Sequence, residues 1–158
     1  MTIHIHKGDL PTSLALGSLI AVDCEMMGLD FNRDRLCLVQ LSSGDGNAHL
    51  VQIAKNQDSA PHLQAILENA DITKIFHYAR LDLAYLWVQL NIGTANIYDT
   101  KIASRLARTY TDKHGYKDIC KELLGADISK QQQTSDCGVD TLSPEQIEYA
   151  AADVLYLH

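Results

Sequence analysis

The sequence has no apolar run approaching the length of a membrane-spanning helix, and its first residues lack the basic and apolar segments of a signal peptide. Its four cysteines, Cys24, Cys37, Cys120 and Cys137, show no C-x-x-C spacing, which argues against a zinc site and against a disulfide framework. The sequence also has no repeats, linker-like stretches or low-complexity tracts. These absences predict one cytoplasmic domain over residues 1–158, with reduced thiols and no membrane partner.

Positive charge is scarce overall but concentrated in one segment. The formal net charge is −7, which argues against non-specific binding of long nucleic acids. Residues 101–130 nevertheless hold seven Lys and Arg against four acids, so the rest of the chain carries −10. A basic segment on an acidic body fits a short nucleic-acid substrate, although solvated helix faces would account for the same charges.

The stretch 19–25 (LIAVDCE) ends an apolar strand with two carboxylates. Because side chains two apart on a strand point the same way, Asp23 and Glu25 should lie side by side, with Cys24 on the opposite face. Such close like charges raise each other's pKa unless a cation lies between them, and hard oxygen ligands suit Mg²⁺ or Mn²⁺. The alternative is a pair of solvated acids on an edge strand.

The hydrophobic pattern predicts a mixed α/β fold. Three consecutive strands with short connections indicate an antiparallel meander, and the strands that follow alternate with helices, which implies parallel crossovers. The predicted strands cover residues 19–25, 36–41, 48–53, 73–77 and 96–99, after a leader strand and loop within 1–18. The predicted helices open at Pro61 and cover 79–87, 100–108, 116–124 and, with Ser143 as the cap, Pro144 to His158.

Two further acids in the second half could join the first pair. Asp82 lies in the first turns of a helix that follows a strand, where open α/β sheets place their sites. Tyr149 and Asp153 are four apart on the last helix and share a face. The alternatives are an exposed helix acid for Asp82 and a packed aromatic for Tyr149. Together with Asp23 and Glu25, these residues suffice for two divalent cations and one activated water.

The segments 22–25 (VDCE), 76–82 (FHYARLD) and 149–153 (YAAAD) resemble the three motifs of the DEDDy branch of DnaQ-like 3′–5′ exonucleases, in the same order and at similar separations. Within that branch the chain is most similar to ribonuclease D, and specifically to oligoribonucleases of the nano-RNase C type. The segments 34–41 and 129–136 extend the likeness across nearly the whole sequence. The resemblance implies a ribonuclease H-like fold with a five-stranded mixed sheet flanked by helices.

The resemblance also implies a two-metal mechanism that releases nucleoside 5′-monophosphates from the 3′ end of short single-stranded RNA, down to dinucleotides. Asp23, Glu25 and Asp153 would hold the metal that binds the attacking water, and Asp23 with Asp82 the metal at the leaving oxygen. Tyr149 would orient that water or take its proton. Relatives of this type form homo-oligomers, so self-assembly is expected.

Substrate contacts are predicted around this centre. Met26, Gly28 and Leu29 follow the first two acids, where Leu29 would be either a wedge between terminal bases or a core residue. His77 could contact a phosphate or could be a satisfied core histidine. Further candidates for phosphate or 2′-hydroxyl contact are Arg105, Arg108, Lys130 and Gln133.

Three features depart from the family pattern. Cys24 stands where relatives usually carry Thr, and Cys137 stands where they often carry Trp, which should loosen the loop before the last helix. The last helix reaches His158 without a capping signal, so either C-terminal helices are missing or the end docks on another subunit.

His4 and His6 alternate on one face and could bind a metal, but surface histidines are the simpler interpretation.

Two alternative functions stay open at this point. One is a DNA 3′–5′ exonuclease of the same superfamily, and the other is a catalytically silent exonuclease fold that serves as an RNA-binding module. Equal-length RNA and DNA substrates distinguish the first, and release of monophosphates distinguishes the second.

Overall fold

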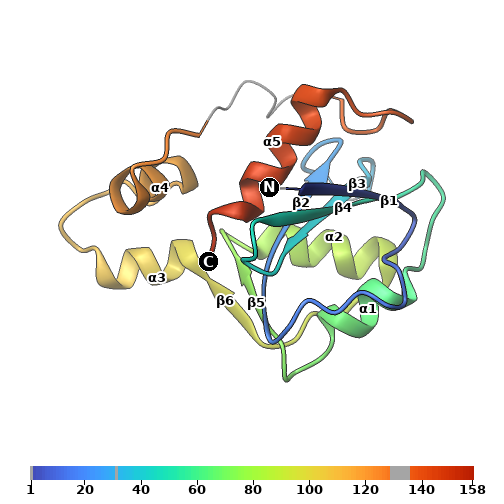
Figure 1. Ribbon diagram of the computed structural model, residues 1–158, viewed down its shortest axis with the longest axis horizontal. Helices are drawn as coiled ribbons and strands as arrows, with labels where there is room; N and C mark the ends of the chain where they lie inside the picture. Colours follow the sequence, from blue (N-terminus) through green and yellow to red (C-terminus); the bar gives the residue numbers. More distant parts are fainter. Residues whose placement is uncertain (1, 31, 129–135) are drawn as a thin grey trace.

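The computed structural model describes residues 2–30, 32–128 and 136–158, and it consists of one six-stranded sheet with helices on both faces (Figure 1). The strands are β1 (Thr2–Lys7), β2 (Leu19–Met26), β3 (Leu36–Ser42), β4 (Asn47–Gln52), β5 (Thr73–Phe76) and β6 (Ile97–Asp99). The helices are α1 (Pro61–Leu67), α2 (Arg80–Leu90), α3 (Thr100–Ala107), α4 (Tyr116–Leu124) and α5 (Pro144–Leu155). Within the described residues, every helix is too short or too polar to cross a membrane.

The strand order is β1-β4-β3-β2-β5-β6. Strands β2, β3 and β4 form the predicted antiparallel meander, while β5 and β6 extend the sheet in parallel from β2. The predicted α/β class is therefore confirmed. The sheet has one strand more than the predicted five, because the leader strand β1 pairs in parallel with β4.

The two faces of β2 contact different helices. Ile20, Val22 and Cys24 belong to the large core cluster with residues of α1 and α2, whereas Ala21 packs in a second cluster with α5. The alternation of a strand therefore sends Asp23 and Glu25 to the α5 face. The prediction that Cys24 faces the other way is confirmed.

Helix α5 begins as its sequence predicts. Ser143 forms a capping box with Gln146, and Pro144 occupies the first turn. The helix ends at Leu155 rather than His158, and the His158 imidazole Nε2 lies 2.9 Å from the carbonyl oxygen of Ser42. Ala150 and Ala151 are buried against the sheet, and small side chains at these positions let the helix approach β2 closely.

Helices α3 and α4 lie beyond β6, to the side of the helices that cover the sheet (Figure 1). Asp99 caps α3 by accepting hydrogen bonds from the backbone N–H groups of Lys101 and Ile102. Helix α4 ends at Gly125 with φ +67°, the left-handed conformation that glycine adopts without steric cost. Helices α3 and α4 supply part of the lining of the pocket described below.

Candidate active site

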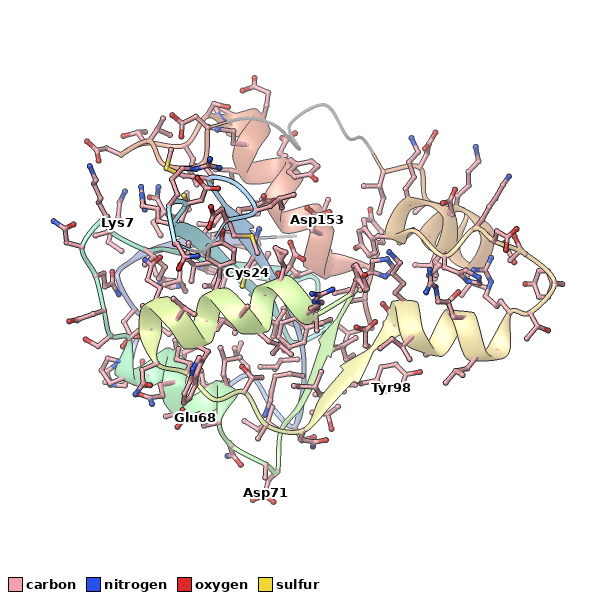
Figure 2. All side chains as sticks on the ribbon, turned by 180° about the vertical axis from the view of Figure 1, so that it is seen from behind. Lys7, Cys24, Glu68, Asp71, Tyr98 and Asp153 are labelled. Carbon is pink, nitrogen blue, oxygen red and sulfur yellow. The ribbon has the colours of Figure 1, made fainter. Side chains whose placement is uncertain are left out.

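Three carboxylates meet where α5 crosses the end of β2. Asp23 and Glu25 leave the strand on the α5 face, and Asp153 comes from α5 itself. One oxygen from each of the three carboxyl groups lies within 4.8 Å of the other two. Figure 2 labels Asp153 on the helix and Cys24 on the strand, between the other two acids in sequence. Residues from opposite ends of the chain thus form one oxygen-rich cluster.

Asp82 approaches the same strand from α2, on the other face of the sheet. Its side chain is buried, so the alternative of an exposed helix acid is wrong. Burial raises the pKa of Asp82 to about 7, and backbone amides, including that of Cys24, act in the opposite direction. After burial, the charge of Asp82 is the largest cause of the raised pKa of Asp23, so these two carboxyl groups are close enough to interact.

The electrostatics of the cluster favour a bound cation. Burial raises the pKa of Asp23 well above its usual value, and the charges of Asp82, Asp153 and Glu25 add to this effect. Burial and the neighbouring Asp153 raise the pKa of Glu25 to about 8, and burial raises that of Asp153 to about 7. These groups cannot all ionise at neutral pH without a counter-charge. The oxygen donor set fits a hard divalent cation such as Mg²⁺ or Mn²⁺.

The position of β2 in the sheet excludes the alternative that Asp23 and Glu25 are solvated acids on an edge strand. The strand lies between β3 and β5, inside the sheet, so Asp23 and Glu25 are not solvated acids on an edge. Tyr149 lies one helical turn before Asp153, close enough for its hydroxyl to interact with the Asp153 carboxylate. Burial, followed by the charges of Asp153 and Glu25, raises the pKa of Tyr149, so its hydroxyl keeps its proton at neutral pH.

A cavity of about 350 Å³ opens over this cluster. Asp23, Glu25, Tyr149 and Asp153 all line it. The remaining polar lining comes from the turn before α2 and from the N-terminal ends of α3 and α4, namely His77, Tyr78, Lys101, Tyr116 and Lys117. The cavity therefore combines an acidic floor with cationic and aromatic side chains from separate elements.

Comparison with known proteins decides the family. The family model described as 3′–5′ exonuclease matches residues 8–158. The chain belongs to this family. The six-stranded sheet and the five helices of the described residues form the DnaQ-like exonuclease fold, as in ribonuclease D and NrnC.

The similar sequences are ribonuclease D proteins. That of Acidiphilium cryptum is 35% identical over 144 residues, which are 91% of this chain and 36% of that protein. That of Gluconacetobacter diazotrophicus is 35% identical over 138 residues, which are 87% of this chain and 35% of that protein. This exonuclease chain thus spans little more than a third of the length of these curated relatives.

The similar structures include Brucella melitensis NrnC bound to pGG, with a TM-score of 0.95 and 50% identity over 100% of this chain and 77% of that one. The same NrnC with bound Mg²⁺ gives a TM-score of 0.94 at 49% identity, with the same coverage. Escherichia coli RNase D, an exoribonuclease involved in structured RNA processing, gives 0.75 at 29% identity over 89% of this chain and 36% of that one.

Three of the predicted substrate contacts follow the first acid pair along the chain. Met26 is half-buried and packs on the core, while Leu29 is 79% exposed, so the core-packing alternative for Leu29 is wrong. The carbonyl of Gly28 accepts a hydrogen bond from the Tyr85 hydroxyl at 3.0 Å. A Cβ at Gly28 would clash with the Asp34 carboxylate, so a larger residue here would require the Asp34 side chain to move.

The predicted contact at His77 has a structural partner and also lines the acidic pocket. Its Nδ1 lies 2.9 Å from the Thr100 hydroxyl, and its ring tilts against Tyr116. Burial and the charge of Lys101 lower the pKa of His77 to about 4, so the imidazole is neutral at neutral pH. His77 can therefore offer a hydrogen bond to a substrate but no positive charge.

The structure corrects the prediction that Arg108 contacts a phosphate or 2′-hydroxyl of the substrate. Its guanidinium is buried and donates to the Ser104 hydroxyl and the Lys113 carbonyl, each at 2.8 Å, and to the Glu122 carboxylate. It lines a different cavity from the acidic one, so the structure does not bring it to the site. Arg105 is exposed on α3 and likewise does not line the acidic cavity, while Lys130 and Gln133 lie outside the described residues.

The sequence interpretation missed Tyr78, Lys101 and Lys117, which line the pocket. Lys101 lies just after Asp99, at the junction between β6 and α3. An acid directly before a helix is a capping signal, and it could have indicated that the start of α3 lies at the pocket. The predicted loosening before α5 stays a prediction, and the described part of that loop makes two hydrogen bonds to other segments. Arg35 donates to the Gly138 carbonyl at 3.0 Å, and Lys7 donates to the Asp140 carbonyl at 2.7 Å.

Proposed function

We propose that this chain is a metal-dependent 3′–5′ exoribonuclease that hydrolyses short single-stranded RNA, down to dinucleotides, to nucleoside 5′-monophosphates. The observation that carries the proposal is the convergence of the Asp23, Glu25 and Asp153 carboxylates within 4.8 Å, with Tyr149 beside them. Family membership supports the direction and type of cleavage, and the similarity to NrnC bound to pGG supports a very short RNA substrate.

The residues present fit two divalent cations, Mg²⁺ or Mn²⁺. Asp23, Glu25 and Asp153 would hold one cation, and Asp23 with Asp82 would hold the second. Such a pair of cations supplies an activated water and stabilises the charge on the leaving 3′-oxygen. The similarity to NrnC with bound Mg²⁺ supports this assignment, and the raised pKa values of the carboxyl groups give its physical reason.

The chain's own side chains then have separate tasks. The protonated Tyr149 hydroxyl, next to Asp153, is placed to orient the attacking water by a hydrogen bond. The rigid strand β2 fixes the spacing of Asp23 and Glu25, and the close approach of α5 fixes Asp153 against them. The exposed Leu29, just beyond β2, is available to separate the terminal base from its neighbour.

The test is product analysis with RNA oligonucleotides of about two to seven nucleotides in the presence of Mg²⁺ or Mn²⁺. We expect stepwise release of nucleoside 5′-monophosphates from the 3′ end, and no release by Asp23→Asn. Faster hydrolysis of DNA of equal length would favour the DNA exonuclease alternative. RNA binding without any monophosphate release by the wild type would favour the silent RNA-binding module. Self-assembly and a cytoplasmic location remain predictions, which gel filtration and fractionation would test.

A further inference from the structure

Gln40 is a polar side chain enclosed in the middle of the sheet. It lies on β3, in which every residue is buried, and its own exposed fraction is 0%. Neither its amide nitrogen nor its amide oxygen has a hydrogen-bond partner among the residues that the structure describes. Burial of an amide without partners costs free energy, because the amide is hydrated in the unfolded chain. An apolar side chain of similar size would fill this position without that cost, so packing alone does not account for a glutamine here.

Gln40 lies beside the acidic cluster. In the antiparallel pairing of β2 with β3, it is the cross-strand partner of Asp23. Directly opposed residues of an antiparallel pair project from the same face, with Cβ atoms about 4.5–5.5 Å apart. Leu38, two residues earlier on β3, packs with Ala150 of α5, so the Gln40 side chain is also on the α5 face. The amide group is therefore within reach of the Asp23 carboxylate.

The other neighbours of Gln40 offer no comparable partner. Its cross-strand partner on β4 is Leu50, which belongs to an apolar cluster together with Ala150 of α5. The Ser42 hydroxyl, two residues further along β3, is already engaged in two hydrogen bonds with backbone groups. The register of the sheet thus places the Asp23 carboxylate as the polar group directly opposite the amide.

We propose that Gln40 is a positioning residue, whose side-chain N–H group donates to the Asp23 carboxylate and fixes the orientation of that carboxylate towards a bound divalent cation. This inference rests on the proposed function, which gives Asp23 a share in both cation sites. A carboxylate that serves two cations must hold both oxygens in fixed directions, and a donor beside it restricts its rotation. The fold would accept the cost of a buried amide because the amide serves activity rather than stability.

The first test compares wild type with Gln40→Met, which removes the amide and keeps an unbranched side chain of similar size. Mg²⁺ binding, measured by titration calorimetry, should weaken by about 10–100-fold, as is typical when a group that orients a metal ligand is removed. In hydrolysis of short RNA, kcat should fall by about tenfold or more while KM for the RNA changes little. Leu41→Met places the same side chain at the next position of β3, on the opposite face, and should retain the wild-type values.

Thermal unfolding without divalent cations separates a positioning role from a structural one. Because the amide has no partner in the described fold, Gln40→Met should raise Tm by about 3 °C or more. A residue that is retained for structure would instead lower Tm when it is replaced. Higher stability combined with weaker Mg²⁺ binding is a result that a purely structural role does not produce.

Three results would overturn the inference. They are a wild-type Mg²⁺ affinity in Gln40→Met, a lower Tm of that variant without cations, and a rise in KM for RNA at constant kcat. Absence of hydrolysis by the wild type on every RNA would instead contradict the proposed function. The calorimetric comparison needs no substrate, so it would still decide whether Gln40 supports cation binding.

Discussion

Two cavities lie on either side of His77 and Tyr116, and they differ in chemistry more than in size. The acidic cavity of about 350 Å³ holds crowded carboxyl groups together with Tyr78, whose φ is +70°, and Lys101, whose Nζ lies 3.9 Å from the centroid of the Tyr78 ring. The other cavity, of about 450 Å³, is lined mainly by apolar side chains of α3 and α4 and by the residues after α5. Its buried polar groups are paired, as Arg108 with Glu122 and Ser104 with His114 show.

The comparison shows that volume is a poor guide to function in this fold. A site that binds cations and phosphates must keep its charged groups unsatisfied until the ligand arrives, and this costs stability. A cavity whose polar groups already have partners has no such capacity. The following predictions test whether the two cavities differ in function as they differ in chemistry.

The largest expected effect is a loss of kcat when a carboxylate of the acidic cavity is removed. Asp153→Asn removes one of the three clustered carboxylates, and loss of a direct metal ligand should lower kcat by more than about 100-fold, because changes one shell further out already cost 10–100-fold. Steady-state hydrolysis of a short RNA measures this effect. Glu148→Gln, an exposed acid on the same helix, is the matched control and should retain activity. Near-normal turnover by Asp153→Asn would remove the acidic cluster from the mechanism.

Tyr149→Phe should lower kcat by about 100-fold or more, with KM and metal binding little changed, because only the hydroxyl that orients the water is lost. The substitution keeps the aromatic ring, so thermal stability should hold. A rise in KM at constant kcat would show that Tyr149 holds substrate instead.

Stabilisation by a divalent cation should increase with pH. The carboxyl groups of Glu25, Asp82 and Asp153 have folded-state pKa values of about 8, 7 and 7, above their ordinary values. The folded chain therefore holds protons that the unfolded chain has lost, so without a cation its stability falls as pH rises from about 4 to about 8. A bound cation replaces those protons, so the increase in Tm caused by Mg²⁺ should be larger near pH 8 than near pH 5.

Thermal unfolding with and without Mg²⁺ at both pH values measures this increase. Asp153→Asn should show a smaller gain, and Glu148→Gln should match the wild type. An Mg²⁺ effect that is equal at both pH values would show that the cation binds away from these carboxyl groups.

The smallest effect on catalysis is expected for a substitution in the other cavity, which is lined mainly by apolar side chains. Arg108→Met removes the guanidinium that donates to Glu122 and to the Ser104 hydroxyl, which keep only Tyr110 and His114 as partners, and should destabilise the fold by about 1–3 kcal/mol, measured by denaturant unfolding. KM for short RNA should remain within about twofold of wild type, since the guanidinium does not line the acidic cavity. A large increase in KM would instead make Arg108 a substrate contact, as its position in the basic segment first suggested.

Local periodicity explains which site residues could be predicted. The period of two on β2 placed Asp23 and Glu25 on one face, and the helical period of 3.6 residues placed Tyr149 and Asp153, four apart on α5, together. The same reasoning could not separate Arg108 from Lys101, because both lie in one basic segment of α3 and its flanks. Burial of Arg108 depends on Glu122 of α4, and the placement of Lys101 at the cavity depends on Asp99, whose carboxylate also binds the distant turn at Tyr78 and Ala79.

The sequence by itself determined the elements, their order and the carboxylates that belong together, because strand and helix periods and capping residues act over a few positions. Only the tertiary structure decided which face of the sheet each acid occupies, that β1 joins as a sixth strand and which basic side chains line the acidic cavity. The physical reason is that pairing, burial and like-charge repulsion arise between segments far apart in the chain, after the sheet has brought them together.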